Sequence, residues 1–337
     1  MSNPHLDLLL EEGSVTSAPA LSAIICTHNA RLEYLAKTLV SLRCQEPLEH
    51  LQAWELLVID NASETPLDAQ LDLSWHPASR VIREMNLGLT HARLRSFREA
   101  RGEILVYIDD DNVLEPAYLR RTLAAFEADP KLGAVGGKSI PRWETEPPDW
   151  FNELGISLAC RDLGDTHLDA EWDNTGKQQR FYPSCAPIGA GMGVRRSAYA
   201  AYVEAASGDP IRIALGRRGA DLSSGEDNDM ILSILAQGWK VAYLPELRLE
   251  HLIPTRRLSA SYLEKYAESS SRTWVEVLAV HGIQIWTPVP RWSLPLRKAR
   301  AWARLRAWEG PVNRIRWRAA CGTFDGRANL SRLGIRS

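Results

Sequence analysis

The sequence predicts an α/β fold, in which a sheet of parallel strands is covered by helices on both faces. Three observations support this prediction. Apolar runs alternate with segments of helical periodicity over residues 21–128. The runs LSAIIC and ELLVID are nearly free of polar residues, as expected of strands that are buried on both faces. Polar residues follow these runs directly, where parallel strands reach the edge of a sheet.

The first elements can be assigned in chain order. Residues 21–26 and 55–60 are predicted strands, and residues 80–84 are a third. One helix is expected between the first two strands and another over about residues 90–100. The first of these helices places four leucines on one face: Leu32, Leu35, Leu39 and Leu42.

The alternation of strands and helices continues beyond Gly102, which ends the second helix. Residues 103–109 are the next predicted strand. Pro116 opens a further helix, whose buried face carries Leu119, Leu123 and Phe126. This order predicts a doubly wound sheet, in which ligands bind at the carboxyl ends of the strands.

The second half of the chain is less regular. Residues 140–190 are rich in Trp, Pro and Gly and lack periodicity, so we expect loops around a site. Residues 224–244 return to a helix, a glycine stop and a strand. We therefore expect a flexible leader over residues 1–20, a sheet domain over 21–255, and a helical, basic C-terminal extension over 256–337.

Charge is distributed unevenly along the 337 residues. The net charge of −2 argues against nucleic acid as a partner of the whole molecule. Residues 291–337, however, carry a net charge of +10, and residues 1–290 carry −12. A basic tail on an acidic body predicts an anionic partner for the tail.

Cysteine usage and hydropathy indicate a cytoplasmic protein. The five cysteines are widely separated and lack a CxxC pair, which argues against a zinc cluster or a disulfide scaffold. The segment MSNPHLDLLLEEGS lacks the features of a secretory signal. No apolar stretch approaches the roughly 20 residues that span a bilayer. We expect a soluble protein whose membrane contact is peripheral, at the inner face.

Three polar clusters follow predicted strands and should meet at one edge of the sheet. They are Thr27-His28-Asn29, Asp60-Asn61 and Asp109-Asp110-Asp111. Adjacent carboxylates repel one another, so the triple aspartate predicts a bound divalent cation such as Mn²⁺ or Mg²⁺. The alternative is an acidic turn that caps the helix beginning near Pro116.

The order of the motifs resembles that of family 2 glycosyltransferases, which have the GT-A fold, a Rossmann-like mixed sheet flanked by helices. The resemblance rests on CTHN (26–29), VIDNAS (58–63), NLGLTHAR (86–93), ARGEILVYIDDDN (100–112), PIGAGMGVRRSAY (187–199), GEDNDMILSILAQGW (225–239) and LEHLIPTRRLSASYL (249–263). It implies an inverting, metal-dependent transferase that moves a sugar from a nucleotide diphosphate to a hydroxyl group.

The resemblance also implies a donor site. The positions that match contacts to the nucleotide and its diphosphate are Thr27, His28, Asn29, Asp60, Arg93, Asp109 and Asp110. His28 replaces the usual Tyr of the family, so Thr27 is an alternative contact to the base. Asp60 could instead form a turn, because Asp-Asn-Ala-Ser is favourable turn chemistry. Arg93 could instead be a solvated helix residue.

Catalytic, metal and acceptor positions follow from the same resemblance. Asp227 matches the general base and Glu226 its partner, while Asp111 matches the direct metal ligand. Asp109 and His251 complete the metal site, and the acceptor residues are Gly189, Gly191, Met192 and Trp150. Structural alternatives stay open, because acids suit the start of a helix, histidines are often buried, and glycines mark tight turns.

Donor and acceptor are open within this resemblance. UDP-sugars are the commonest donors of the family, with GDP- and dTDP-sugars as alternatives, and the acceptor would be a glycan or a lipid-linked saccharide of polysaccharide or cell-envelope biosynthesis. A sugar nucleotidyltransferase would carry a glycine-rich loop that CTHNARLEY lacks. A non-catalytic binding module would not need intact acidic motifs. A dehydrogenase is disfavoured, since no GxGxxG follows a strand.

The tail has two interpretations. It combines arginines with five tryptophans: Trp286, Trp292, Trp302, Trp308 and Trp317. An amphipathic helix of this composition lies on anionic lipid, which predicts peripheral membrane contact through residues 286–337. In the other interpretation the tryptophans pack on the catalytic domain and the arginines extend into solvent.

Overall fold

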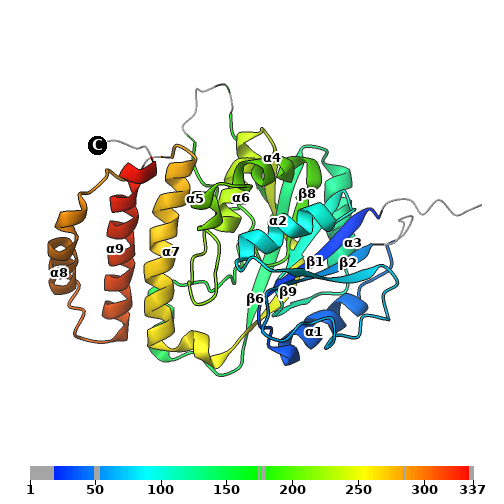
Figure 1. The fold of residues 1–337 in the computed structure, drawn as a ribbon, viewed down its shortest axis with the longest axis horizontal. Helices are drawn as coiled ribbons and strands as arrows, with labels where there is room; N and C mark the ends of the chain where they lie inside the picture. The colour runs from blue at the N-terminus through cyan, green and yellow to red at the C-terminus, as the bar shows by residue number, and fades with distance from the viewer. Residues whose placement is uncertain (1–18, 49–53, 174, 176–179, 284, 334–337) are drawn as a thin grey trace, which may run out of the picture.

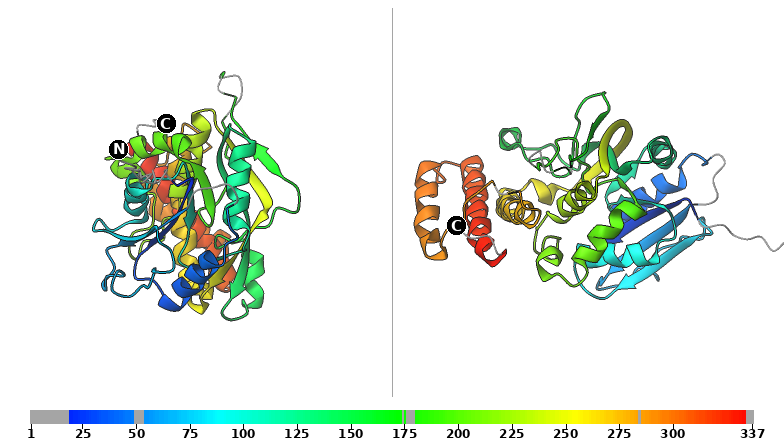
Figure 2. Two further views of the ribbon diagram at one scale, coloured as in Figure 1. Left: turned by 90° about the vertical axis from the view of Figure 1, so that its right-hand side faces the viewer. Right: turned by 90° about the horizontal axis from the view of Figure 1, so that it is seen from above.

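The computed structural model describes residues 19–48, 54–173, 175, 180–283 and 285–333 (Figure 1). Over these residues, one mixed sheet of nine strands has the order β3-β2-β1-β4-β8-β6-β9-β5, with β7 paired to β9. Helices cover both faces of the sheet (Figure 2). The predicted leader over residues 1–20 lies almost wholly outside the described residues.

Four parallel strands make up the amino-terminal half of the sheet, as the sequence predicts. They are β1 Leu21–Thr27, β2 Glu55–Asn61, β3 Ser79–Glu84 and β4 Ile104–Ile108. In the register of β1 and β2, Thr27 lies opposite Asp60. The carboxyl ends of both strands therefore reach the same edge of the sheet.

Alternate residues of these strands contact helices on opposite faces. Ile24 of β1 packs in the cluster that contains residues of α2 Leu89–Glu99. Its neighbour Ile25 packs in the cluster of α1 Leu32–Arg43 and α3 Tyr118–Ala128. The predicted apolar face of α1 is confirmed except for Leu32, which is 46% exposed because it begins the helix.

The other half of the sheet differs from a uniformly parallel arrangement. Its strands are β5 Asn112–Leu114, β6 Leu132–Trp143, β7 Leu168–Ala170, β8 Met192–Arg195 and β9 Lys240–Ile253. β8 is antiparallel to β4 and β6, and β5 and β7 are antiparallel to β9. The sequence pattern misses β6, because the glycines and proline of LGAVGGKSIPRW interrupt the alternation typical of a strand.

Three helices on this half cover the same face as α2, opposite to α3. They are α4 Arg196–Ala206, α5 Pro210–Ile213 and α6 Glu226–Ala236. Residues of α4 and α6 share a core cluster with residues of α2. The helix, glycine stop and strand predicted over residues 224–244 correspond to α6, Gly238 and the start of β9. Short 3₁₀ turns are η1 Asp149–Leu154, η2 Thr255–Leu258, η3 Arg291–Ser293 and η4 Leu330–Leu333.

Three long helices follow β9, in agreement with the helical character expected there. They are α7 Ala260–Val280, α8 Leu294–Arg304 and α9 Pro311–Asn329. α9 lies beside α7, and α8 is outermost (Figures 1 and 2). Residues of β9, η1, α7 and α9 share one apolar cluster. The predicted domain boundary at residue 255 stays a prediction. Among the described residues, no helix combines the length and apolar character needed to cross a membrane.

Glycines allow α9 to approach α7 closely. A Cβ on Gly322 would overlap the backbone carbonyl oxygen of Glu268, and a Cβ on Gly326 would lie 2.8 Å from the carbonyl oxygen of Arg272. These contacts leave no room for a side chain at Gly322 or Gly326.

We expect Gly322→Leu to push α9 away from α7 and to lower the stability of the chain by at least about 1–3 kcal/mol, because overpacking strains both helices. Calorimetric melting of the full chain measures the loss. Ala303→Leu is the matched control, since it adds the same side chain at an exposed position of α8. Equal melting temperatures for the two variants would contradict the close packing.

Candidate active site

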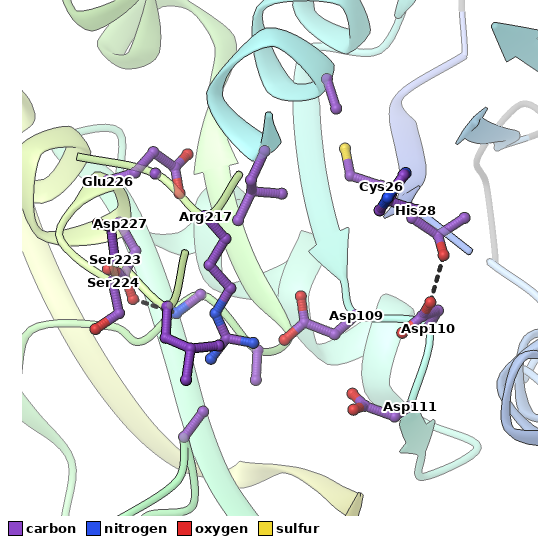
Figure 3. A pocket seen from close by; sticks show the side chains of 18 of the residues that line it. Cys26, His28, Asp109, Asp110, Asp111, Arg217, Ser223, Ser224, Glu226 and Asp227 are labelled. Atoms are coloured by element: carbon purple, nitrogen blue, oxygen red, sulfur yellow. Dashed lines mark hydrogen bonds between the residues drawn. The ribbon is translucent and has the colours of Figure 1, made fainter. Parts of the chain in front are cut away.

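One cavity collects the polar clusters at the carboxyl ends of the strands (Figure 3). Its volume is about 630 Å³, within the range of small-molecule sites. The wall includes the segments that follow β1 and β4, the end of β2, the first turn of α6 and the end of β9. Segments that are far apart in sequence therefore meet where the doubly wound pattern predicts a ligand site.

Eleven of the fifteen residues singled out from the sequence line this cavity. They are Thr27, His28, Asn29, Arg93, Asp109, Asp110, Asp111, Gly189, Glu226, Asp227 and His251. The other four are described by the structure but are not among the lining residues: Asp60, Trp150, Gly191 and Met192. Sharing a cavity does not assign a role, so the individual roles stay predictions.

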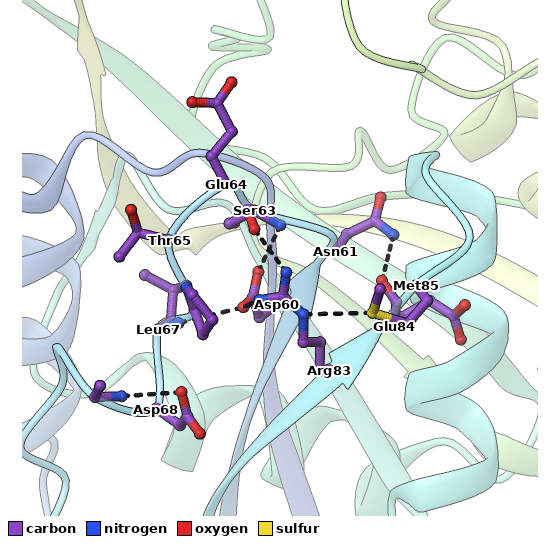
Figure 4. A network of polar contacts seen from close by, with 12 residues as sticks. Asp60, Asn61, Ser63, Glu64, Thr65, Leu67, Asp68, Arg83, Glu84 and Met85 are labelled. Atoms are coloured by element: carbon purple, nitrogen blue, oxygen red, sulfur yellow. Dashed lines mark hydrogen bonds and ion pairs between the residues drawn. The ribbon is translucent and has the colours of Figure 1, made fainter.

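Asp60 is engaged by its own turn (Figure 4). Its carboxylate accepts hydrogen bonds from the backbone N–H groups of Ser63 at 3.0 Å and Leu67 at 3.2 Å, and it pairs with Arg83 Nη1 at 2.7 Å. Burial alone would raise the pKa of Asp60, but the bonds from Ser63 and Leu67 and the charge of Arg83 hold it below its usual value. Asp60 therefore has the contacts of a turn residue, and its neighbour Asn61 lines the cavity.

Three predicted acceptor residues have packing roles. Gly191 has a φ of +72°, and a Cβ there would lie 2.5 Å from the hydroxyl oxygen of Tyr118. Met192 is fully buried in the core. Trp150 packs against the apolar cluster shared by η1, α7 and α9. Of the four predicted acceptor residues, Gly189 is the one that lines the cavity.

A buried ion pair joins α2 to α6 in the wall of the cavity. Arg93 Nη1 lies 2.8 Å from Glu226 Oε1, and both side chains are 3% exposed. The guanidinium carbon of Arg93 also lies 5.1 Å from the centroid of the Tyr107 ring. Because a buried charge without a partner is costly, this pair fixes the first turn of α6 against α2. Asp227 is the next residue of that turn.

The two partners respond differently to burial. Burial raises the pKa of Glu226 to about 7, although Arg93 lowers it. Burial lowers the pKa of Arg93, but Glu226 raises it above its usual value, so Arg93 is charged. The folded chain thus binds a proton at Glu226 more tightly than the unfolded chain. This term favours folding below the unfolded pKa of 4.5, and it is lost as the pH rises through about 7.

Asp227 presents its carboxylate to the cavity from the first turn of α6 (Figure 3). Oδ2 accepts a hydrogen bond from the Gly189 N–H at 3.1 Å, and Oδ1 accepts one from the Asn228 N–H at 2.9 Å. A Cβ on Gly189 would lie 2.9 Å from Arg93 Nη2 and 3.4 Å from Asp227 Oδ2. A side chain at Gly189 would therefore press on the guanidinium group of Arg93. The Asp227 carboxylate keeps lone pairs for a ligand.

The triple aspartate forms the turn between β4 and β5. Its three residues repel one another, and each has different neighbours. Asp110 accepts a hydrogen bond from the Thr27 hydroxyl, while burial and the charge of Asp111 raise the pKa of Asp110 to about 7. Burial would also raise the pKa of Asp111, but cationic neighbours lower it to about 2. The backbone N–H of Asp109 donates to Asn112 Oδ1 at 3.0 Å.

The cationic neighbours of Asp111 come from the end of β9 and from η2. His251 Nε2 lies 3.2 Å from Asp111 Oδ1, and Arg257 Nη2 lies 3.0 Å from Asp111 Oδ2. Arg257 Nη1 also lies 3.1 Å from His251 Nε2. Burial lowers the pKa of His251, but Asp111 raises it to about 10, so the imidazole is protonated beside the carboxylate. Positive charge gathers where the sequence predicts a cation.

The residues present fit a divalent cation that takes few protein ligands. Among the described residues, no group of three or more His, Cys, Asp or Glu side chains could hold a metal ion. Asp111 and His251 nevertheless supply a carboxylate and an imidazole in contact at the cavity wall. Mg²⁺ and similar ions often take one or two carboxylates and leave the other positions to water and phosphate. Such an ion would displace Arg257 and the proton of His251.

Sequence patterns do not single out several basic and aromatic residues of the cavity. They are Arg217, Arg256, Arg257, Tyr262 and Tyr266. Arg256 and Arg257 belong to the segment LEHLIPTRRLSASYL. Two adjacent arginines after a predicted strand are the sequence feature that could have identified them as site residues. Arg217 lies in an aperiodic loop, yet its charge helps to lower the pKa of Asp111. Guanidinium groups of this kind can bind phosphate oxygens.

Comparison with known sequences identifies the family. The model of glycosyl transferase family 2 matches residues 22–203, which is more than half of the chain. The chain belongs to glycosyl transferase family 2. The resemblance found in the motifs is thereby confirmed, and the matched residues of this family 2 member include the end of β2 and the segments after β1 and β4, which meet at the cavity.

Curated relatives of this family 2 member are distant, and the matches cover only part of each. A glucosyl-dolichyl phosphate glucuronosyltransferase of Haloferax volcanii is 28% identical over 138 residues, covering 40% of this chain and 42% of that protein. The inactive polypeptide N-acetylgalactosaminyltransferase-like protein 5 of Macaca fascicularis is 27% identical over 251 residues, covering 72% of this chain and 54% of that protein. The chain spans about half the length of these relatives.

Solved structures show the fold of this family 2 member. The mannosyltransferase PcManGT from Pyrobaculum calidifontis, in complex with GDP-Man and Mn²⁺, matches with a TM-score of 0.51 and 20% identity over 94% of this chain and 88% of that chain. GalNAc-T7 with UDP, GalNAc and Mn²⁺ matches with a TM-score of 0.53 and 18% identity over 91% of this chain and 55% of that chain. The fold is GT-A, with a C-terminal helical extension.

The Arg93–Glu226 pair leads to a stability prediction. Above the raised pKa of Glu226, at about pH 8, Glu226→Gln leaves Arg93 charged and buried without its ionised partner, and Arg93→Met leaves Glu226 without its partner. We expect each to lower the free energy of unfolding by about 3–5 kcal/mol. The double variant should lose less than the sum, as measured by urea denaturation.

The matched control for this cycle is Arg95→Met with Glu99→Gln, since these side chains lie 2.9 Å apart on the same helix and are 38% and 27% exposed. We expect its coupling to be below about 1 kcal/mol. Strictly additive losses for the 93/226 cycle would show that the two buried charges do not depend on each other.

Proposed function

We propose that this family 2 member is an inverting glycosyltransferase, which moves a sugar from a nucleotide-diphosphate donor to a hydroxyl group of a glycan or lipid-linked saccharide. UDP-sugars are the donors to test first. The observation that supports this proposal most strongly is that Asp227 and the triple aspartate line one cavity. A general base and a diphosphate site must reach the same sugar, and a shared cavity meets that requirement.

Asp227 is the proposed general base. A hydroxyl is a weak nucleophile near neutral pH, so its proton must be accepted while the bond to the anomeric carbon forms. Two backbone N–H groups, from Gly189 and Asn228, orient the Asp227 carboxylate for this task. Glu226 is paired with Arg93, and it would hold the helix start rather than accept the proton. Attack on the face opposite the nucleotide inverts the anomeric centre.

The leaving diphosphate needs positive charge around it. We assign Asp111 and His251, with Asp109 nearby, as the residues that would hold Mn²⁺ or Mg²⁺, which acts as a Lewis acid on phosphate oxygens when bound. Mn²⁺ accompanies GDP-Man in PcManGT and UDP in GalNAc-T7. Arg217, Arg256 and Arg257 line the same cavity, and their guanidinium groups would bind the diphosphate directly.

The donor nucleotide is assigned to the segments that follow β1 and β4. Their cavity-lining residues are Thr27, His28, Asn29, Asp109 and Asp110. Arg93 is also assigned to the donor. Because Arg93 Nη1 is paired with Glu226, the other nitrogens of its guanidinium group would contact the donor. A contact from Asp60 to the base would require its turn to open, whereas Asn61 already lines the cavity.

The acceptor is assigned to the side of the cavity where Gly189 meets Asp227. The Haloferax volcanii relative is named for glucosyl-dolichyl phosphate, a lipid-linked saccharide. That name favours a lipid-linked acceptor and a place in polysaccharide or cell-envelope biosynthesis for this chain as well. Such an acceptor would bring the basic residues 286–337 to the cytoplasmic face of an anionic membrane.

A non-catalytic binding module is the second candidate, because one relative carries the word inactive in its name. A sugar nucleotidyltransferase is the third. Product analysis separates them. A transferase releases a nucleoside diphosphate from a nucleotide sugar, a nucleotidyltransferase releases pyrophosphate from a nucleoside triphosphate and a sugar phosphate, and a binding module releases neither.

We expect Asp227→Asn to keep donor binding but to lower transfer by roughly 10²–10⁴-fold, because the amide cannot accept the proton. Calorimetric titration measures donor binding, and release of nucleoside diphosphate measures transfer. Asp165→Asn is the matched control, since the Asp165 side chain is 92% exposed and outside the cavity. Substantial transfer by Asp227→Asn would remove this residue from the role of base.

We expect Asp111→Asn to weaken Mn²⁺ binding at least roughly 10-fold in the presence of UDP, because it removes the charged ligand of the proposed site. Electron paramagnetic resonance of free Mn²⁺ measures this affinity without any need for turnover. Asp165→Asn again serves as the control. Unchanged Mn²⁺ affinity in Asp111→Asn would exclude Asp111 as the ligand and leave the diphosphate to the arginines.

A further inference from the structure

The outermost helix of the molecule is α8, which packs on α9 at the end of the helical extension (Figures 1 and 2). With η3 before it and the turn after it, this part of the chain covers residues 291–308. None of the residues of α8 itself is buried. One side of the helix faces α9, and its other sides face solvent.

Large apolar side chains are exposed along this segment. Trp292 is 82% exposed, Leu296 73%, Trp308 55% and Trp302 43%. Soluble proteins scatter single exposed apolar residues, but they rarely gather several large ones on one surface. A cluster of this kind within residues 292–308 indicates an interaction surface.

The exposed residues are ordered in two strips that run along the helix. At 3.6 residues per turn, Leu296, Ala299 and Ala303 lie on one face of α8. With Trp292 of the preceding η3 they make up the apolar strip, and all four residues are exposed. The adjacent face carries the cationic strip, made of Arg300 and Arg304, which are both exposed. An apolar strip bordered by cations is the pattern of helices that lie in a membrane interface.

The charge of the segment has one sign. Residues 291–308 contain six Lys or Arg residues and no Asp or Glu. Among the described residues, the ion pairs of this segment join Lys298 to Asp325 and Arg306 to Glu309. These pairs leave the cationic strip to solvent and available to an anionic partner.

We propose that residues 291–308 bind the surface of an anionic lipid bilayer, with the apolar strip among the headgroups and the cationic strip against lipid phosphates. Tryptophan favours this interface because its ring is apolar and its N–H is polar. Each basic residue near an anionic surface adds to the attraction. Membrane binding of this kind does not require the proposed transferase activity.

Other occupants fit the two strips less well. A second copy of the chain would bring two cationic strips together in a symmetric contact, and like charges would repel. A nucleic acid would neutralise the cationic strip but would leave Trp292 and Leu296 in water. An anionic bilayer satisfies both strips at once.

The helix is held in place before it meets a membrane. Lys298 Nζ lies 2.8 Å from Asp325 Oδ2 of α9, and Trp317 Nε1 donates a hydrogen bond to the Lys298 carbonyl oxygen at 3.0 Å. Trp286 packs against the main core cluster. Two of the five tail tryptophans thus pack on the protein, as one sequence interpretation predicts, while the three exposed ones remain for the bilayer.

Vesicle flotation with the full chain tests this proposal. We expect binding to phosphatidylcholine vesicles that contain phosphatidylglycerol, little binding to phosphatidylcholine alone, and a loss of binding at high salt. Trp292→Ser/Leu296→Ser removes the apolar strip, and Arg300→Glu/Arg304→Glu reverses the cationic strip. Each pair of substitutions should weaken binding by roughly 10-fold or more.

Matched controls change similar residues elsewhere on the surface. Val40→Ser/Met85→Ser removes two apolar side chains that are 59% and 69% exposed, and Lys37→Glu/Arg120→Glu reverses two exposed cations. Both controls should bind vesicles as the wild-type chain does, and melting temperatures show that every variant is folded.

The proposal is overturned if the wild-type chain does not float with anionic vesicles, or if the controls lose as much binding as the strip variants. Light scattering and an oligonucleotide binding assay complete the test. If the chain forms a dimer that Trp292→Ser/Leu296→Ser disrupts, the surface binds a second copy rather than a bilayer. If the chain binds an oligonucleotide more strongly than vesicles, the partner is a nucleic acid. No nucleotide sugar enters these assays, so their failure would leave the proposed function untouched.

Discussion

The cavity depends on the buried ion pair between Arg93 and Glu226. Arg93 lies on α2, which packs on the parallel half of the sheet. Glu226 begins α6, which packs on the mixed half. A charge that is 3% exposed needs its partner, so the two halves are held in one arrangement. Asp227 follows Glu226 directly, and the backbone N–H of Gly189 donates a hydrogen bond to its carboxylate. The pair thus positions the carboxylate that we assign as the base.

A second constraint is the repulsion among Asp109, Asp110 and Asp111. The fold does not avoid it. Asp111 is paired with His251 and Arg257, while Asp110 has a raised pKa and accepts a bond from Thr27. These partners come from the end of β9, from η2 and from the end of β1. The carboxylates of one turn therefore contact three segments that are far apart in the sequence. Folding alone would be served as well by uncharged residues, which is the physical reason to assign the turn to a diphosphate and its cation.

Much of this arrangement could be predicted from the sequence, and the failures have physical causes. Strands β1, β2 and β4 and helices α1 and α3 follow from periodicity, because buried strands and one-sided helices leave strong patterns. The sequence patterns of β6 and β8 are weak, because glycines interrupt β6 and β8 has only four residues. Asp60 lies at the end of β2 and Asp111 lies after β4, but local turn bonds and Arg83 engage the carboxylate of Asp60. Met192 stands one residue beyond a loop glycine and turns into the core. Arg217 and Arg257 reach the cavity from irregular segments, whose side-chain directions depend on tertiary structure.

The central claim is that one cavity holds the diphosphate of an activated sugar beside Asp111 and its reacting carbon beside Asp227. The most direct measurement is a crystal structure of the full chain with UDP and Mn²⁺, in which anomalous scattering locates the manganese. The account predicts a manganese peak in contact with the Asp111 carboxylate and the nucleotide in the cavity that Asp227 lines. A nucleotide bound elsewhere, or one that lies in this cavity with its diphosphate remote from Asp111, would contradict it.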